Sequence, residues 1–419
     1  MINLRSIVYL IIFIMPLYLW RFSIVGIPMN ILEMMIYILF FVWTLNKIKN
    51  VISSKNGKSN IVSVFKKYIF LKQFYLLHIG IVLLLLGAIV STAFSSDIRT
   101  SLGIFKGWFV SPFLFFIVFI NIIKKREHIY WSLKSWIVSG ICVSLISFYY
   151  LLSGNITFDG RLKAFYLSPN HLAMYLAPII IILIYFLLNE KKENKLFNLI
   201  LLIIVSIPLY FTYSYGAFLG ILAGIFYLLF KSKKFTYKNI FISIISVFLF
   251  FLLIFMSANK VEQIANSQSR SSFHSRMMIW NSAGKIIKDN PLFGIGPGTF
   301  QETYLSYSIK FDESYLEWAV PQPHNIFLAF YLQTGFIGLI GFILILIWLF
   351  SYKNMVQFVF FIKALMIYTL VHGLVDTTYW KNDLALIFWI IIGLNFVNSR
   401  NILKNNDKTV YSFPLDNIE

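Results

Sequence analysis

The sequence predicts an all-α polytopic membrane protein, and three observations support that fold class. Hydrophobic residues make up 59% of the 419-residue chain and charged residues only 13%, whereas soluble domains carry about 25% charged residues. Most apolar segments are close to the length of about 20 residues with which an α-helix crosses a bilayer. They also lack the regular alternation of apolar and polar residues that is typical of a transmembrane barrel.

Apolar runs divide the chain into about twelve expected spans, because each run is long enough to cross the membrane as a helix. The first run has the length of a signal peptide, but no small-residue cleavage site follows it, and we interpret it as a span. The only cysteine, Cys142, falls inside a span, so the chain offers no internal disulfide. The expected spans are 6–20, 30–45, 74–93, 101–123, 129–152, 171–189, 196–212, 214–230, 239–257, 326–350, 355–371 and 384–398.

Basic residues are concentrated in alternate loops, which indicates how the chain is oriented. By the positive-inside rule these loops, and with them both termini, lie on the cytoplasmic side. The net charge of +19 then follows from topology, and its spread over short loops argues against nucleic-acid binding. The basic loops contain Lys47, Lys49, Lys55, Lys58, Lys66, Lys67 and Lys72; Lys124, Lys125 and Arg126; Lys191, Lys192 and Lys195; and Lys231, Lys233, Lys234 and Lys238.

These expectations divide the chain into four parts. Residues 1–257 form nine spans, 258–325 form one long outward loop, 326–398 form three further spans, and 399–419 form a polar cytoplasmic tail. The long loop is where we expect function, because the rest of the chain is almost entirely membrane helix. On that side of the membrane neither ATP nor nucleotide sugars are available.

Arg276 lies in a stretch with helical spacing that ends at Asn290–Pro291, since the residue before a proline is disfavoured in a helix. One interpretation is an amphipathic helix on the membrane surface, whose basic residues contact lipid phosphates. The other is a guanidinium that holds a diphosphate through paired hydrogen bonds. The residues alone favour neither.

His324 follows Pro323 at the entry to the tenth span. A neutral histidine can accept a proton from an attacking hydroxyl, although an interfacial histidine bonded to a backbone carbonyl is the common alternative. The nearby segment Gly294-Ile295-Gly296-Pro297-Gly298 lacks the Gly-Lys-Ser/Thr of a nucleotide loop and predicts a tight turn. Asp-x-Asp and metal-ligand spacings are absent from the sequence, so no metal or other cofactor is expected.

Several segments together resemble the superfamily of O-antigen ligases and O-antigen polymerases, membrane glycosyltransferases of bacterial envelopes. The resemblance covers about residues 160–395 and includes the order of the elements and the long outward loop. The matching segments are Arg276 with Trp280; Asn290-Pro291-Leu292-Phe293-Gly294 to Phe300; Pro323-His324-Asn325; Thr334-Gly335-Phe336; Arg161 with Pro169-Asn170-His171-Leu172-Ala173; and His372-Gly373-Leu374-Val375-Asp376.

Two positions depart from the family pattern. Where the family often has Ser-Arg-Gly between the seventh and eighth spans, this chain has Ser214-Tyr215-Gly216. The resemblance therefore leaves Arg161, Lys163 or Arg270 as substitutes for a phosphate-binding arginine. The second departure is Gln333, which stands where the family often has glutamate, and an acidic role at that position is in doubt.

The resemblance implies a GT-C-like fold in the bacterial cytoplasmic (inner) membrane. It implies metal-independent, inverting transfer of a glycan from an undecaprenyl-diphosphate-linked oligosaccharide donor to a glycan or lipid acceptor. His324 would take the acceptor's proton and Arg276 would hold the leaving diphosphate. Substrate binding would involve Arg161, Lys163, Arg270, Asn325, Asp376 and Tyr215. Asn325 and Asp376 are candidates for orienting His324 or for binding sugar.

Other functions stay open at this point. A polymerase, partnered with a chain-length regulator, and a ligase share these motifs, as does a protein O-oligosaccharyltransferase. A lipid-glycan transporter or flippase is the alternative from another class. It predicts an internal two-fold repeat and polar residues near mid-membrane, whereas the sequence has no such repeat and places its polar residues at the outer face.

Overall fold

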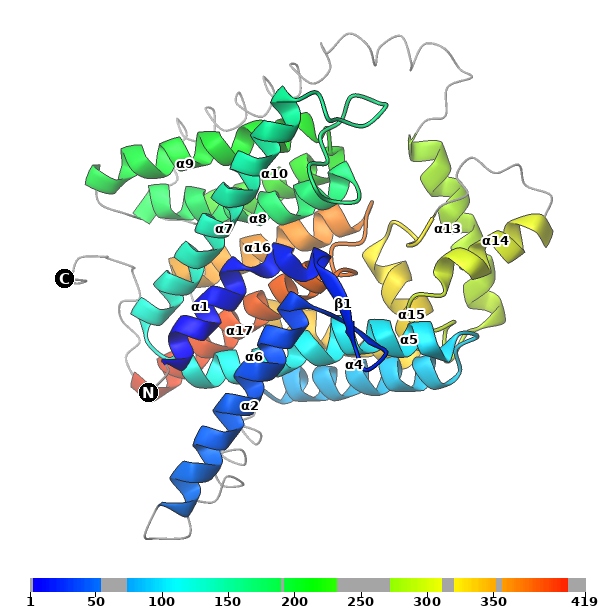
Figure 1. Cartoon of the computed structure of the whole chain (residues 1–419), viewed down its shortest axis with the longest axis horizontal. Coiled ribbons are helices and arrows are strands. Elements are labelled where there is room, and N and C mark those ends of the chain that lie inside the picture. Colours follow the sequence, from blue (N-terminus) through cyan, green and yellow to red (C-terminus); the bar gives the residue numbers. More distant parts are fainter. Residues whose placement is uncertain are drawn as a thin grey trace.

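The computed structural model describes residues 3–53, 74–189, 192–231, 272–310, 320–351 and 356–405. Over these residues the protein is all-α and polytopic, as the sequence predicted, with one small hairpin (Figure 1). The elements are α1 (Leu4–Phe13), η1 (Met15–Leu19), β1 (Arg21–Ile24), β2 (Ile27–Asn30), α2 (Ile31–Ile52), α4 (Tyr75–Ala93), α5 (Ile98–Phe105), η3 (Lys106–Val110), α6 (Ser111–Ile122), α7 (Arg126–Leu152), α8 (Pro169–Asn189), α9 (Lys192–Phe211), α10 (Tyr215–Lys231), α13 (Ser272–Asp289), α14 (Phe300–Lys310), α15 (Ile326–Ser351), α16 (Gln357–Gly373) and α17 (Asn382–Asn405).

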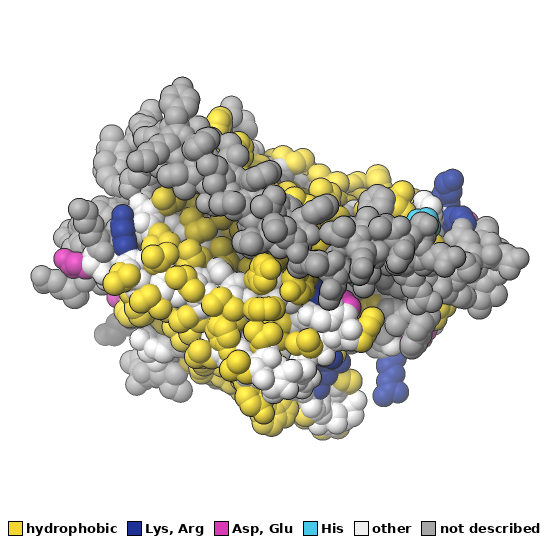
Figure 2. Space-filling model, turned by 90° about the horizontal axis from the view of Figure 1, so that it is seen from above, with side chains coloured by type: hydrophobic (Ala, Val, Ile, Leu, Met, Phe, Trp, Pro, Cys, Tyr) yellow, Lys and Arg dark blue, Asp and Glu magenta, His cyan; other side chains and the backbone are white. Residues whose placement is uncertain are grey.

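Within the described residues, eight helical segments are long and apolar enough to cross a membrane, and each coincides with an expected span. Helices α10 and α16 match two further expected spans, although each has only 17 residues. The expected span 239–257 lies outside the described residues. Figure 2 shows hydrophobic side chains over much of the visible described surface, as a lipid-facing protein requires.

The first expected span, 6–20, is wrong in its extent. Helix α1 ends at Phe13, and a short 3₁₀ turn with Pro16 near its start follows. Proline lacks the amide hydrogen that an α-helix would need there, so the helix stops before it. The chain then forms the antiparallel hairpin β1–β2, in which Arg21 pairs with Asn30 and Ile24 with Ile27.

The last span also differs from the expectation, because α17 continues to Asn405 rather than ending at 398. Polar contacts to the end of α6 hold this extension. Arg400 donates from Nη1 to the carbonyl of Ile120 at 2.6 Å, and Asn401 donates to the carbonyl of Lys124 at 2.8 Å. The expected tail from residue 399 therefore begins as a helix.

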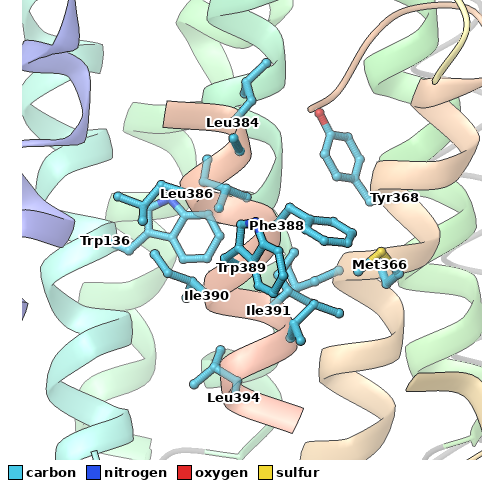
Figure 3. Close-up of a cluster of buried hydrophobic side chains, with 14 of the residues drawn as sticks. Trp136, Met366, Tyr368, Leu384, Leu386, Phe388, Trp389, Ile390, Ile391 and Leu394 are labelled. Atoms are coloured by element: carbon cyan, nitrogen blue, oxygen red, sulfur yellow. The ribbon is translucent and has the colours of Figure 1, made fainter. Parts of the chain in front are cut away.

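Helix α17 lies at the centre of the molecule, and its apolar stretch is fully buried. Figure 3 shows Trp389, Phe388 and Ile391 of α17 among side chains from neighbouring helices, including Trp136 of α7 and Met366 of α16. Around this core, α4 packs along α15, α10 along α16, α6 along α17 and α8 along α9. Burial of these large apolar side chains fixes the positions of the loops at the helix ends.

Small residues allow α4 and α15 to approach closely. A Cβ atom added to Gly87 would lie 2.4 Å from the backbone nitrogen of Gly338, and one added to Gly341 would lie 2.3 Å from that of Leu84. Helix α15 is also interrupted at Gly335, where φ is 69° and ψ is −178°. The expected span 326–350 is therefore two helical pieces joined at a glycine, a conformation that other residues rarely adopt.

The loops that contain the predicted site residues gather at one end of the bundle and bond to one another. Leu162 donates its amide to the carbonyl of Phe211, and Ser101 donates to the carbonyl of Pro297. Loop 374–381 joins these loops through the hydrogen bonds of Asp376 with Asn170 and His324. This end lies opposite the Lys124–Arg126 turn, which α17 reaches through Asn401.

Candidate active site

The site begins at the junction between loop 320–325 and α15. Asn325 caps this helix, because its Oδ1 accepts hydrogen bonds from the amides of Phe327 at 2.9 Å and Leu328 at 3.1 Å. Its Nδ2 donates to the carbonyl of Leu374 at 3.0 Å, which ties the junction to the loop after α16. The side-chain oxygen and nitrogen of Asn325 thus both make hydrogen bonds within the protein. The sequence predicted this residue only as one that binds substrate or orients His324.

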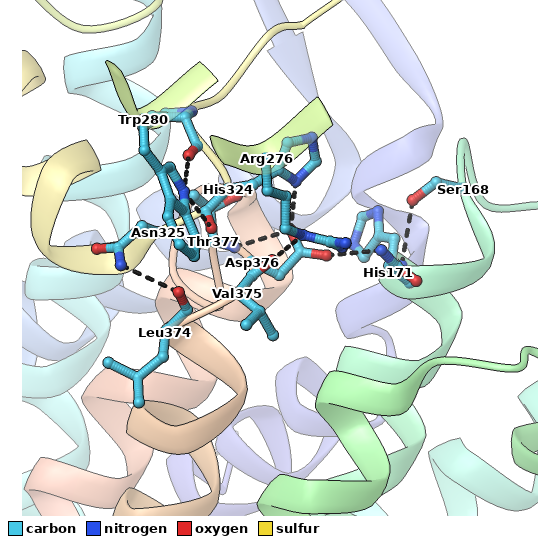
Figure 4. Close-up of polar contacts among 12 residues, drawn as sticks. Ser168, His171, Arg276, Trp280, His324, Asn325, Leu374, Val375, Asp376 and Thr377 are labelled. Atoms are coloured by element: carbon cyan, nitrogen blue, oxygen red, sulfur yellow. Dashed lines mark hydrogen bonds and ion pairs between the residues drawn. The ribbon is translucent and has the colours of Figure 1, made fainter. Parts of the chain in front are cut away.

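His324 precedes this cap and has a left-handed backbone, with φ at 48°. That region is disfavoured for residues with a side chain and costs energy, which surrounding contacts must supply. Here the indole nitrogen of Trp280 on α13 donates to two carbonyls, that of Pro323 at 3.1 Å and that of His324 at 3.4 Å. The histidine backbone is therefore held from α13, and its imidazole is directed toward loop 374–381 (Figure 4).

The imidazole of His324 forms a hydrogen bond with Asp376, with 3.2 Å between Nδ1 and Oδ1. The Asp376 side chain is 5% exposed and that of His324 is 26% exposed. A carboxylate only accepts hydrogen bonds, so the proton shared by this pair belongs to Nδ1 of the histidine. The other ring nitrogen, Nε2, is then the acceptor in the neutral imidazole.

Asp376 keeps its negative charge despite burial. Burial alone would raise the pKa of this carboxyl group, but the hydrogen bond from His324 and the neighbouring positive charges hold the pKa well below its usual range. The amide of Thr377 also donates to Oδ1 at 2.8 Å. A charged carboxylate next to Nδ1 fixes both the tautomer and the orientation of the imidazole.

Arg276 lies next to this pair. It comes from α13, and its Nε donates to the carbonyl of Val375 at 2.7 Å, one residue before Asp376 (Figure 4). The guanidinium is close enough to Asp376 to contribute to the low pKa of that carboxyl group. Of the two interpretations of Arg276, this geometry favours a fixed guanidinium inside the cluster over a side chain on the membrane surface.

Arg161 belongs to the same cluster and is held by side-chain hydrogen bonds to Thr212 and Asn170. Its Nε donates to the carbonyl of Thr212 at 2.8 Å, and its Nη2 donates to Oδ1 of Asn170. Burial lowers the pKa of Arg161, while Asp159 and Asp376 act in the opposite direction. An arginine stays charged under these conditions, so Arg161 contributes a positive charge to the site.

The remaining predicted residues are less closely connected to His324. Tyr215 begins α10 and is close enough to Arg161 to act on its charge. The adjacent Gly216 has no room for a side chain, because an added Cβ atom would lie 2.7 Å from the ring of His372. Lys163 is half-buried in the loop that carries Arg161. Arg270 lies outside the described residues.

The glycine turn docks against the break in α15, through main-chain atoms. The amide of Ile295 donates to the carbonyl of Leu332 at 2.7 Å, and the amide of Phe336 donates to the carbonyl of Leu292 at 3.0 Å. A Cβ atom added to Gly294 would lie 2.3 Å from the carbonyl oxygen of Leu332. The glycines therefore allow two backbones to approach each other, and the turn holds loop 290–299 in place.

Gln333, one of the two departures from the family pattern, also serves this turn. Its Oε1 accepts from the amide of Gly298 at 2.9 Å, and its Nε2 donates to Oε1 of Gln322 at 2.5 Å. The side chain is completely buried. An amide can donate and accept at once, so the glutamine side chain satisfies both partners in this arrangement.

Sequence reasoning assigned no role at the site to Asn170, a polar residue that belongs to the cluster. Asn170 donates from Nδ2 to Oδ2 of Asp376 at 2.8 Å, while its Oδ1 accepts from Arg161. The residue did belong to the Pro169-Asn170 segment of the family resemblance. Its two partners lie nine and 206 positions away, and no local pattern shows such a contact. Over the described ranges, no three His, Cys, Asp or Glu side chains are grouped to hold a metal ion.

Comparison with known proteins agrees with the motifs. A protein of Rickettsia conorii, provisionally named a polysaccharide ligase, is 28% identical over 265 residues, which are 61% of this chain and 62% of that protein. An uncharacterized protein of Haemophilus influenzae is 22% identical over 250 residues, 55% of this chain and 61% of its own. Each match thus covers less than two thirds of the relative.

The protein-family model described as O-antigen ligase matches residues 199–343. This segment contains Tyr215, Arg276, His324 and Asn325, whereas Arg161, Asn170 and Asp376 lie on either side of it. The matched segment thus includes the predicted histidine and arginine of the long loop. The resemblance of this chain to the O-antigen ligase family is therefore confirmed, and it is carried by residues 199–343.

Proposed function

We propose that this protein transfers a glycan from a polyprenyl-diphosphate-linked donor to a hydroxyl group, as a polymerase or ligase of a cell-surface polysaccharide. One observation carries the proposal, namely the contact of His324 Nδ1 with the buried carboxylate of Asp376, beside the anchored guanidinium of Arg276. The similarity to O-antigen ligases and to a named polysaccharide ligase supports the same chemistry.

In this proposal His324 is the general base. Asp376 keeps the proton on Nδ1, so Nε2 accepts the proton of the acceptor hydroxyl as its oxygen attacks the anomeric carbon. The bond from that carbon to the diphosphate oxygen breaks, and the diphosphate leaves with the electron pair. Attack from the face opposite the leaving group inverts the anomeric configuration.

Arg276 stabilises the charge that develops on the leaving diphosphate. A guanidinium binds phosphate oxygens through parallel hydrogen bonds, and the Nε of Arg276 is anchored to the Val375 carbonyl at 2.7 Å. Because the group is held before the reaction starts, little reorganisation is needed when the charge appears. In the proposal this fixed cation, with the charge of Arg161 nearby, takes the part that a metal ion plays in other glycosyltransferases.

The distribution of basic residues supports an orientation with the site on the outer face of the cytoplasmic membrane. The turn Lys124–Arg126 lies at one end of the bundle, where Asn401 bonds to it, and the site loops lie at the other. The positive-inside rule assigns the basic end to the cytoplasm. The opposite face has no nucleotide sugars, so the proposed donor there is linked to a membrane lipid.

The test compares purified wild type with His324→Asn and Arg276→Gln on a polyprenyl-diphosphate glycan, in the presence of EDTA, and follows release of the carrier. Asparagine tolerates the left-handed backbone of position 324 and cannot act as a base. We expect the rate to fall about 10² to 10⁴-fold for the histidine variant and about 10² to 10³-fold for the arginine variant.

The matched controls are His78→Asn in α4 and Arg99→Gln at the exposed start of α5, neither of which contacts the cluster. Both should transfer glycan at the wild-type rate. A folded His324→Asn protein with wild-type activity would show that another group is the base. Complete loss of wild-type activity in EDTA, restored by a divalent cation, would contradict the metal-independent mechanism.

A further inference from the structure

Asn170 lies between the two charged parts of the site and makes one hydrogen bond to each. Its Oδ1 accepts from Nη2 of Arg161, and its Nδ2 donates to Oδ2 of Asp376 at 2.8 Å. The amide orientation is unambiguous, because a guanidinium can only donate and a carboxylate can only accept. Neither an aspartate nor a residue without a polar side chain could satisfy both neighbours.

Each of the two partners of Asn170 makes further hydrogen bonds. Arg161 is fixed at its other edge by the Thr212 carbonyl, at 2.8 Å from Nε. Asp376 uses its other oxygen, Oδ1, for His324 Nδ1 and for the amide of Thr377. A continuous series of hydrogen bonds thus connects the turn between α9 and α10 to the imidazole of His324, through loop 153–168, the start of α8 and loop 374–381.

We propose that Asn170 is a positioning residue, whose amide orients the Asp376 carboxylate and thereby the imidazole of His324. This inference rests on the proposed function, since it assigns His324 the role of base. Without the Nδ2 donor, Oδ2 loses a bond and the carboxylate can rotate about its Cβ–Cγ bond. The imidazole would then lose the fixed geometry on which proton acceptance depends.

Titratable groups from four elements face the imidazole or its carboxylate partner. They are Asp376 from the loop before α17, Arg276 from α13, Arg161 from the loop before α8, and His372 from α16. Asn170, which lies among them, does not titrate. A second negative charge at position 170 would stabilise the protonated imidazole of His324, and a base in that form accepts no proton.

The decisive variant is Asn170→Asp, which keeps an acceptor for Arg161 but turns the donor that faces Asp376 into a second carboxylate oxygen. We expect kcat to fall on the order of tenfold to a hundredfold, with the donor KM within about threefold of wild type. We also expect the acid limb of the pH–rate profile to move to higher pH. Asn170→Ala should lower kcat less and leave the acid limb closer to that of wild type.

A matched control is Asn382→Asp. Asn382 is also buried and donates from Nδ2 to a carboxylate, Glu33 Oε1, at 2.8 Å, while its Oδ1 accepts from the indole of Trp108. The substitution creates the same pair of facing carboxylates in a different cluster. It should lower the melting temperature without moving the acid limb, so a pH shift in Asn170→Asp alone reports the link to His324.

Wild-type kcat in Asn170→Asp would overturn the inference, because the hydrogen bond from Asn170 to Asp376 would then not be needed to position His324. A raised KM with unchanged kcat would also overturn it, since Asn170 would then bind substrate directly. If Asn170→Asp does not fold, the comparison uses Asn170→Ala and Asn170→Ser, where lower kcat at constant KM supports the inference and wild-type kcat overturns it. The His324→Asn assay separates the two claims: if that variant is inactive while Asn170→Asp matches wild type, only the role of Asn170 fails.

Discussion

At the scale of single residues, the site depends on the pairing of one histidine with one buried carboxylate. The left-handed backbone of His324 and the Trp280 bond to the preceding carbonyl hold the imidazole where Asp376 can accept from Nδ1. Such an arrangement lowers the free energy of unfolding, because a strained backbone and a buried charge both oppose folding. The cost is consistent with a functional role for the pair.

Replacement of Asp376 by asparagine tests this pairing through pH. The pKa of Asp376 is lowered, so the carboxylate stays charged as the pH falls toward its ordinary value and below. The fall in rate at low pH therefore reports protonation of the His324 imidazole rather than protonation of Asp376. In Asp376→Asn the imidazolium loses its counter-charge, and we expect the acid limb to move to lower pH. We expect the rate at neutral pH to fall on the order of 10²-fold or more, since the corresponding change in Ser-His-Asp triads costs about 10⁴-fold.

The measurement is a pH–rate profile of carrier release for wild type and Asp376→Asn at saturating donor. An acid limb that stays in place, together with an unchanged kcat and a raised donor KM, would show that Asp376 binds sugar instead. This distinguishes the two roles that the sequence left open for that residue.

At the scale of elements, the glycine contacts between α4 and α15 hold the two helices at a fixed separation. Gly87 faces the backbone of Gly338 with no intervening space. We expect Gly87→Ala to lower the free energy of unfolding by about 1–3 kcal/mol, because an added methyl group has nowhere to go in a packed interface. The control is Gly103→Ala in α5, where nothing lies within 4 Å of an added Cβ atom.

Melting temperatures in detergent compare the two variants with wild type. Gly103→Ala should melt at or slightly above the wild-type temperature, because alanine favours the helix more than glycine does. An unchanged melting temperature for Gly87→Ala would mean that the two helices can separate without loss of stability.

The sequence predicted the long helices and singled out two candidate site residues. Hydropathy predicted the long helices, and the motifs proposed His324 and Arg276, since both signals are local. It was not sufficient for the hairpin at Arg21–Asn30, because residues 6–20 are apolar throughout and only Pro16 marks the early end of α1. Nor could it show that Asn170, Arg161 and Asp376 meet, because that contact depends on how α8 and α16 pack in three dimensions.

At the scale of the whole molecule, the site loops and the basic turns occupy opposite ends of one bundle. This predicts the accessibility of introduced cysteines. After the native Cys142 is replaced by serine, Asn155→Cys, in the exposed loop that carries Arg161, should react with a membrane-impermeant maleimide in intact cells. Ser53→Cys, exposed after α2, should react only after the cells are permeabilised.

Labelling of Ser53→Cys in intact cells, with protection of Asn155→Cys, would reverse the orientation and place the site in the cytoplasm. The Cys142→Ser background protein is the control for labelling at other groups. A reversed result would leave the His324–Asp376 geometry unchanged but would contradict a donor presented on the outer face.

The junction between the glycine turn and the break in α15 is built from main-chain atoms, with Gly294 and Gly335 at the closest approach. Gly294, Gly296 and Gly298 all have a positive φ, and an added Cβ atom at each would lie 3.0 Å or less from a neighbouring atom. The position of loop 290–299 against α15 is therefore set by the absence of side chains, and one substitution at these glycines would displace the whole loop.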